Sequence, residues 1–166
     1  MLLSAALLSQ SSSNHESRYD AVFRHAGHVI GVDWNRLKAQ ALAENSTFDP
    51  YAESSVGAVG CAQFLPKTWD WLNEKYALNW HIENCKQSLL MQALYMRYLM
   101  NRCDSAGVAV NDHWDCAVLA YNHGEGNLFA KIRKAGGFAL SLVDDVVETK
   151  KYRRVIGRLW KRLRRQ

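Results

Sequence analysis

Prolines and long apolar runs are scarce in this sequence. Only two prolines and ten glycines occur among 166 residues, which excludes a Gly/Pro-rich repeat and disfavours a turn-dense β-sandwich. No apolar run approaches the roughly 20 residues that a membrane-spanning helix needs. Because 48% of the residues are hydrophobic, the chain can bury a core, and a wholly disordered protein is excluded. These features favour a helical, globular protein.

Acidic residues are missing from one end of the chain. Residues 150–166 contain nine Lys and Arg and no Asp or Glu. The other 149 residues contain twelve basic and sixteen acidic residues, so they carry a net charge of −4 although the whole chain carries +5. The basic character therefore belongs to the C-terminus, which is suited to anionic partners such as nucleic acid, anionic lipid or lipopolysaccharide.

The four cysteines lie at positions 61, 85, 103 and 116. Cys85 and Cys103 bracket a predicted helix that would hold them ~27 Å apart, too far for a disulfide. Helix geometry does not exclude a disulfide between Cys103 and Cys116. No CxxC…CxxC-type set occurs, so no metal site is expected. The preferred interpretation is four free, mostly buried thiols.

Apolar residues at three- and four-residue spacing predict a series of helices. Asp33 is suited to cap the second of them. The segment 45–66 contains both prolines and predicts a loop or short strands. Residues 1–16 form an N-terminal segment with a leucine-rich, weakly signal-like stretch, which is equally suited to a core-capping helix. The predicted helices are 17–31, 33–44, 68–76, 86–102, 112–121 and 127–134.

Glu44 is the first candidate for chemistry. It follows Ala41-Leu42-Ala43 at the end of a predicted helix and precedes a loop rich in aromatics and hydroxyls. Apolar surroundings raise the pKa of a carboxyl group, and a general acid that works near neutral pH needs such a shift. An ordinary exposed helix-end glutamate is the alternative, and position alone favours it.

Four sequence blocks change that balance. They are ENSTFDP (44–50), SSVGAVGCAQFLP (54–66), AYNHGEG (120–126) and ETKKY (148–152). In order and spacing they resemble the soluble lytic transglycosylase family, whose core fold is similar to that of goose-type lysozymes. The resemblance covers about residues 20–156. It implies a mainly α (α+β lysozyme-like) fold, as a single compact helical domain with a peptidoglycan-binding groove.

The resemblance also implies roles for individual residues. Glu44 matches the single catalytic acid/base, and Ser54 matches a serine near the scissile sugar. Gln63 matches a glutamine that lines the glycan groove. The pair beside the glutamate and the late tyrosine that closes the site correspond to Tyr121, Asn122 and Tyr152.

The chain departs from the family pattern in three places. Asn45 intervenes after the glutamate, which we interpret as a one-residue insertion with Ser46 as the displaced serine. Cys61-Ala62 replaces the usual Leu-Met before the glutamine. In the third block, His123 and Glu125 replace Ala and Pro, so Glu125 is an unexpected carboxylate near the site.

The activity implied by the resemblance is cleavage of the MurNAc–GlcNAc β-1,4 bond of peptidoglycan with formation of 1,6-anhydromuramic ends, without any cofactor. A lysozyme-type muramidase is the enzymatic alternative, with Asp49, Glu53 or Glu125 as a second carboxylate. A non-enzymatic glycan-binding or membrane-active structural protein is the alternative from another class. The catalytic domain is expected to span 17–156 and to be followed by a basic tail, 157–166.

The expected partners are peptidoglycan strands, with contact of the tail to an anionic membrane or lipopolysaccharide. No nucleic-acid recognition motif occurs, so no specific nucleic-acid partner is expected. The chain is expected to act as a monomer in the periplasm. A phage virion or host-lysis setting is favoured over a bacterial accessory enzyme.

Overall fold

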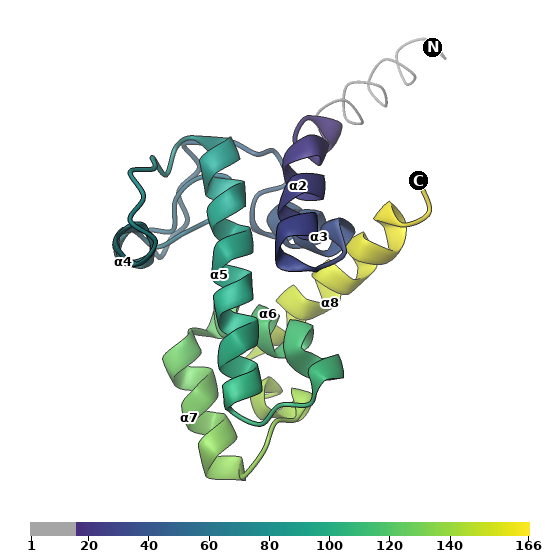
Figure 1. Ribbon diagram of the computed structural model, residues 1–166. Helices are drawn as coiled ribbons and strands as arrows, with labels where there is room; N and C mark the ends of the chain where they lie inside the picture. The colour runs from purple at the N-terminus through teal and green to yellow at the C-terminus, as the bar shows by residue number, and fades with distance from the viewer. Residues whose placement is uncertain (1–15) are drawn as a thin grey trace. The chain divides into compact units, whose positions relative to one another are not determined.

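A computed structural model describes residues 16–166, and the mainly helical class predicted from the sequence is confirmed (Figure 1). The predicted N-terminal segment lies outside the described residues except for Glu16. Each predicted helix is present, with ends within three residues of the prediction. The elements are α2 (Asp20–Ile30), α3 (Trp34–Glu44), α4 (Pro66–Lys75), α5 (Cys85–Ser105), η1 (Val110–Asp112), α6 (His113–His123), α7 (Glu125–Ala135), η2 (Leu140–Val143) and α8 (Val147–Leu163).

The chain forms two compact units, and the boundary between them, after Met91, lies inside α5. The long helix therefore contributes its first third to one unit and the remainder to the other. Within residues 16–166, no helix is long and apolar enough to cross a membrane.

The first unit is built on the contact between α2 and α3. As predicted, Asp33 caps α3, because its carboxylate accepts a hydrogen bond from the Asn35 amide at 3.0 Å. Phe23 from α2 and Leu37 from α3 are almost completely buried in the core. This packing fixes the direction in which α3 delivers its last residue, Glu44.

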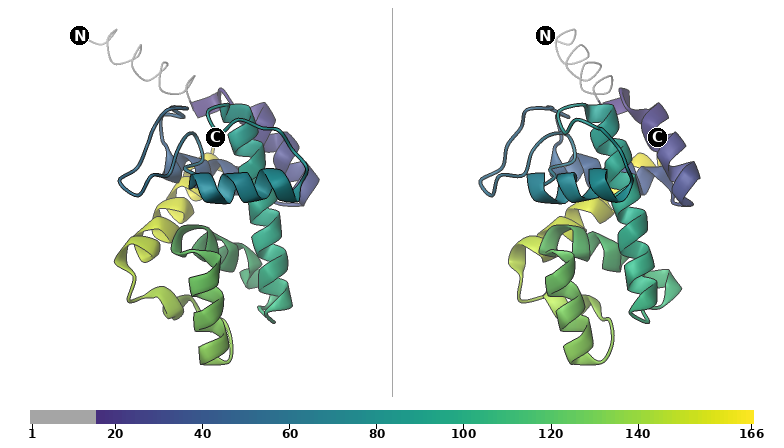
Figure 2. Two further views of the ribbon diagram at one scale, coloured as in Figure 1. Left: turned by 90° about the vertical axis from the view of Figure 1, so that its left-hand side faces the viewer. Right: turned by 60° about the vertical axis from the view of Figure 1, so that its left-hand side comes forward.

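An irregular segment connects α3 to α4 and contains two isolated β-bridges but no strand (Figure 2). The bridges pair Val59 with both Glu53 and Phe64. Gly60 directly follows Val59 and has a φ of +79°. A Cβ at this position would lie 2.9 Å from the Ile82 carbonyl oxygen. Only glycine fits this left-handed position and this close approach of two backbone segments.

The prediction of free cysteines is wrong. Cys61 is bonded to Cys85 and Cys103 to Cys116, with Cα atoms 5.4 and 6.3 Å apart. The helix argument excluded only the pairing of Cys85 with Cys103. It gave no information on Cys61, because the path of an irregular segment cannot be read from apolar spacing. Disulfides persist in oxidising compartments such as the bacterial periplasm.

The second unit is organised around α6, which packs against α7 and α8. Residues 116–120 of α6 are all buried, so this helix is enclosed by the rest of its unit. α8 is amphipathic and buries Thr149, Tyr152, Ile156 and Leu163 on one face. The boundary expected between catalytic domain and basic tail, at 156/157, lies inside this helix.

Candidate functional site

Glu44 is the last residue of α3 and is half-buried. The two residues before Ala43, Ala41 and Leu42, are buried, and the chain leaves the helix at Asn45, whose backbone is extended. The carboxyl group is therefore carried by a rigid, well-packed helix end and remains partly accessible. This is a suitable position for a group that must exchange a proton with a ligand.

Asn45 organises the loop that follows Glu44. Its side-chain amide donates to the carbonyl oxygens of Asp49, at 2.8 Å, and Gly60, at 3.3 Å. Its Oδ1 accepts from both the backbone N–H and the hydroxyl of Thr47. Asn45 is 8% exposed, so these bonds lie in a desolvated environment where they are stronger than at the surface. The residue that the sequence presents as an insertion is the centre of the loop's hydrogen bonding, whereas Ser46 is exposed.

Phe48 anchors the same loop in the core. Its ring meets Tyr19 edge-on at a centroid distance of 5.3 Å and lies 6.1 Å from the ring of Phe23. Its φ of +51° is unusual for a bulky residue and is maintained by this burial. The Cys61–Cys85 disulfide lies against the same residue, since the two sulfur atoms are 3.1 and 3.4 Å from the Phe48 carbonyl oxygen.

Gln63 is held by the backbone of the irregular segment. Its Nε2 donates to the carbonyl oxygens of Ala52, at 3.1 Å, and Gly60, at 3.0 Å. The Gly60 carbonyl oxygen thus accepts hydrogen bonds from both Asn45 and Gln63. Asn45 directly follows Glu44, and Gln63 is the predicted groove residue, so this shared acceptor holds the two parts of the segment together. The amide of Gln63 is committed to structure, and its Oε1 is the atom suited to a ligand.

Ser54 closes a tight turn in the same segment. Its hydroxyl accepts from the Ala58 amide at 3.0 Å, and its backbone N–H donates to the Ala58 carbonyl at 2.9 Å. The hydroxyl proton remains available for donation. Tyr51 and Val56, on either side of Ser54 in the chain, are 78% and 75% exposed.

In the second unit, Tyr121 lies in a group of aromatic rings. Its ring is 5.4 Å from that of Tyr95, which stacks on Tyr98 at 6.1 Å. Burial raises the pKa of Tyr95 far above its ordinary value, and Glu125 and Tyr98 add to the effect. Tyr95 is therefore a neutral, structural phenol that supports the half-buried Tyr121.

Glu125 begins α7 and is held from α5. The Tyr98 hydroxyl donates to its Oε1 at 3.4 Å, and the Arg102 guanidinium is 3.8 Å from the same oxygen and 3.0 Å from the Tyr98 hydroxyl. The other oxygen, Oε2, is buried without a hydrogen-bond partner among the described residues. The Glu125 carboxylate is thus held by the Tyr98 hydroxyl and the Arg102 guanidinium. The sequence motifs did not indicate either partner.

Asn122 lies one residue further along α6 and is exposed. Its Oδ1 accepts a 2.8 Å hydrogen bond from the hydroxyl of Thr149, which is 2% exposed and comes from α8. Because the oxygen is engaged, the NH₂ group is the part of Asn122 suited to a ligand. Tyr152 follows one turn later on α8 and is 9% exposed. The motif blocks AYNHGEG and ETKKY are therefore joined within this unit.

Thr149 provides a test of this arrangement. Thr149→Val keeps the shape of the side chain but removes the donor, so the Asn122 amide loses its fixed orientation. If Asn122 binds glycan, as the sequence motif predicts, we expect an activity loss of about fivefold, equivalent to about 1 kcal/mol, and an increase in KM for glycan fragments. Thr149→Ser, which retains the hydroxyl, should restore most of the activity. Equal rates for wild type and Thr149→Val in a sacculus-clearing assay would contradict the proposed orientation.

The three candidate second carboxylates lie in different settings. Asp49 is exposed and its Oδ1 accepts from the Tyr51 amide, while Glu53 is exposed in the bridge with Val59. Glu125 belongs to the second unit. Among residues 16–166, no group of three His, Cys, Asp or Glu is placed to hold a metal ion.

Comparisons with known proteins agree with the motif analysis. The model of the transglycosylase SLT domain matches residues 21–142. No curated protein sequence matches the chain significantly. The structure is similar to the X-ray structure of an inactive mutant of lytic transglycosylase Slt from Pseudomonas aeruginosa, with a TM-score of 0.70 and 18% sequence identity. That match covers 88% of this chain and 24% of the Slt chain, so this chain spans about a quarter of its length.

At 18% identity the structural match establishes a shared fold. The match to the family model ends ten residues before Tyr152, whose assignment therefore depends on the ETKKY motif alone. Well over half of the sequence is matched by the family model, and the chain belongs to the transglycosylase SLT domain family.

Proposed function

We propose that this protein is a peptidoglycan lytic transglycosylase, a glycan-cleaving lyase in which Glu44 is the single acid/base. The observation that carries the proposal is the placement of Glu44: it is half-buried at the end of a packed helix, in a chain that belongs to the SLT family. The loop after it is fixed by Asn45 and Phe48, so the carboxyl group has little freedom to move away from a bound glycan.

The reaction uses one carboxyl group twice. Protonated Glu44 donates to the glycosidic oxygen between MurNAc and GlcNAc as that C–O bond breaks. The resulting carboxylate accepts the proton of the muramic C6 hydroxyl, whose oxygen bonds to the anomeric carbon of the same sugar. Glu44 is thereby protonated again, and the product carries a 1,6-anhydro ring. No water is consumed, and the route uses neither a metal nor an organic cofactor.

The remaining predicted residues are proposed to bind the glycan strand. The hydroxyl of Ser54 and Oε1 of Gln63 are the atoms that the first unit leaves for a ligand. In the second unit these are the NH₂ of Asn122 and the phenol of half-buried Tyr121. Tyr152 is buried, and we propose that it supports the site at its edge.

A lysozyme-type muramidase is the second candidate. That chemistry places a second carboxylate ~5–9.5 Å from the acid, where it acts as nucleophile or activates water. Asp49 and Glu53 are exposed carboxylates of the first unit. Glu125 is a half-buried carboxylate of the second unit. A glycan-binding or membrane-active protein without enzymatic activity is the third candidate, and such a protein has no need of a carboxyl group at position 44.

The proposed setting is the periplasm, where the chain acts as a monomer on the cell wall. Both disulfides support an oxidising compartment. We favour a phage virion or host-lysis role over a bacterial accessory enzyme, because a cationic segment such as residues 150–166 suits that role. The basic tail, 157–166, is proposed to contact an anionic membrane or lipopolysaccharide.

Mass spectrometry of muropeptides released from purified peptidoglycan tests the proposed chemistry. We expect 1,6-anhydromuramic ends, which are lighter by one water than the reducing ends that a hydrolase produces. Reducing ends would establish the muramidase instead. The absence of any product from folded protein would favour the non-enzymatic candidate.

A further inference from the structure

The outer face of α8 forms a strongly basic surface. It lines a groove of about 780 Å³ together with the segment before the helix. Six of the lining residues are cationic: Lys150, Lys151, Arg153, Arg154, Arg158 and Lys161. We call this set the basic face. It begins well before residue 157 and is part of a regular helix, so the cationic region is larger and more rigid than a C-terminal tail.

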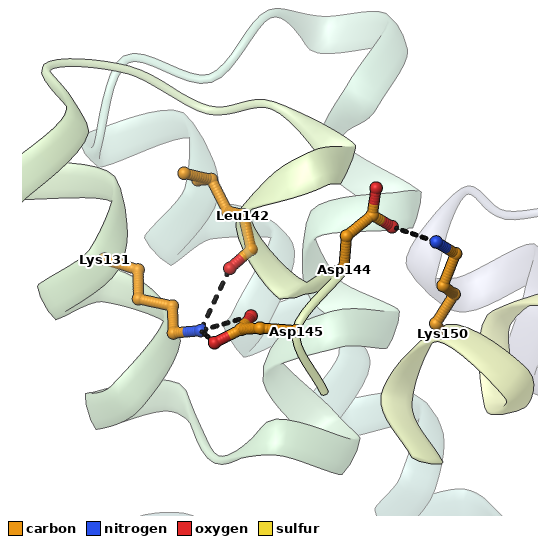
Figure 3. Close-up of polar contacts among 5 residues, drawn as sticks. All are labelled: Lys131, Leu142, Asp144, Asp145 and Lys150. Carbon is orange, nitrogen blue, oxygen red and sulfur yellow. Dashed lines mark hydrogen bonds and ion pairs between the residues drawn. The ribbon is translucent and has the colours of Figure 1, made fainter. Parts of the chain in front are cut away.

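Asp144 and Asp145, which precede α8, leave most of this charge unpaired. Asp144 forms an ion pair with Lys150 at 3.0 Å (Figure 3). Asp145 is bound 2.9 Å from Lys131 of α7, whose ammonium also donates to the Leu142 carbonyl at 3.0 Å. The Lys131 hydrogen bond lowers the pKa of Asp145 below its ordinary value, so this partner stays ionised and engaged.

Five cations of the basic face have no carboxylate within ion-pair distance in the described part of the chain: Lys151, Arg153, Arg154, Arg158 and Lys161. From Lys151 to Lys161 the helix holds them along about 15 Å. Such an array produces a positive potential that attracts a partner carrying several anions at once. A single small anion would leave most of the array unused.

The apolar face of α8 is already occupied. Tyr152, Ile156 and Leu163 are buried within their own unit. An amphipathic helix that inserts into lipid needs an exposed apolar face, and α8 offers solvent only Val147 as a large exposed apolar residue. Binding at this face therefore depends on charge and not on insertion.

Nucleic acid fits this surface less well than a lipid headgroup layer. Proteins that bind single strands combine cations with exposed aromatic rings on which bases stack. On α8, Tyr152 is buried, and Trp160 is half-buried with the Arg164 guanidinium 5.3 Å from its ring centroid. The disulfides also indicate a compartment in which membrane phosphates are the abundant polyanion.

We propose that the basic face of α8 binds the headgroup phosphates of an anionic phospholipid bilayer, peripherally and without insertion. The choice of bilayer rests on the proposed function only through the compartment that it implies. The family-model match ends before α8 begins, so this surface lies outside the part of the chain that defines the family.

The test is co-sedimentation of the full chain with vesicles of phosphatidylcholine alone or mixed equally with phosphatidylglycerol. We expect binding to the anionic vesicles only, and its loss when salt shortens the Debye length to a few ångströms. Arg154→Glu/Arg158→Glu should weaken binding by more than about tenfold, since each cation near an anionic surface contributes about fivefold. Cleavage of purified sacculi should be unchanged.

The matched control is Arg133→Glu/Lys134→Glu, which changes the net charge equally at two exposed residues in the last turn of α7. It should keep most of the binding. If charge reversal in α8 prevents folding, judged by circular dichroism, Arg154→Gln/Arg158→Gln against Arg133→Gln/Lys134→Gln provides the same comparison.

Equal loss in both double variants would overturn the proposal, because net charge alone would then explain binding. Salt-independent binding, or tighter binding to lipopolysaccharide or DNA than to the vesicles, would also overturn it. Wild type that binds vesicles but cleaves no sacculi would refute the proposed function and leave this inference standing. Vesicle binding and sacculus cleavage therefore test this inference and the proposed function separately.

Discussion

Replacing Glu44 with glutamine is expected to lower the release of muropeptides by at least about a hundredfold. General acid–base catalysis contributes factors of about 10² to 10⁴, and here one carboxyl group supplies both proton transfers. Glutamine has nearly the same shape but neither donates a proton to the glycosidic oxygen nor accepts one from the C6 hydroxyl. Because Glu44 is half-buried at a helix end, the free energy of unfolding should change little.

The measurement is mass spectrometry of soluble muropeptides over time, with urea unfolding of each variant as a check on folding. Glu74→Gln is the matched control, because it makes the same substitution at an exposed residue near the end of α4 in the same unit. It should retain wild-type rates. Substantial anhydromuropeptide release by Glu44→Gln would refute the assignment of Glu44 as the acid/base.

A related variant separates the two enzymatic candidates. Asp49→Asn/Glu53→Gln removes both exposed carboxylates that follow Glu44 in the first unit. A transglycosylase should keep most of its activity, since its mechanism uses one carboxyl group only. A muramidase that depends on either residue as its second carboxylate should lose it.

The helices were predictable because each buries a continuous apolar stripe. In α5, Leu89, Met96 and Leu99 recur at helical spacing and are all buried. The same reasoning applies to α8, where Tyr152 and Ile156 face inward. Local spacing determines such elements, so no knowledge of distant contacts is needed.

The irregular segment was not predictable in the same way. Asn45 reads as an insertion, yet its side chain bonds to Asp49 and Gly60, which are 4 and 15 residues away. The Cys61–Cys85 bridge depends on the path of this segment, which no periodicity encodes. These features arise from long-range contacts, and only the structure reveals them.

The candidate site shows the same division. The motifs identified Glu125 as an unexpected carboxylate, but its partner Tyr98 lies 27 residues earlier on a different helix. The Thr149 hydroxyl is likewise 27 residues from the Asn122 that it orients. Family motifs indicate the candidate ligand-binding side chains, while the residues that hold them follow from tertiary packing.

Removing either disulfide is expected to lower the free energy of unfolding by roughly 3 kcal/mol, because each bridge restricts the unfolded chain. The two bridges should differ in their effect on activity. Cys61→Ser/Cys85→Ser releases the segment that carries Gln63 and lies against Phe48, so sacculus cleavage should fall several-fold even where the protein is fully folded.

Cys103→Ser/Cys116→Ser is the matched variant, because it removes the bridge from the end of α5 to α6 in the second unit and leaves the loop after Glu44 intact. Its loss of stability should be similar, but its cleavage rate well below the unfolding transition should stay near that of wild type. Urea unfolding and sacculus clearing at one temperature measure both quantities. Equal activity losses in the two variants would show that the first bridge has no special role in holding the loop, whereas a selective loss would identify it as the covalent support of the loop that follows Glu44.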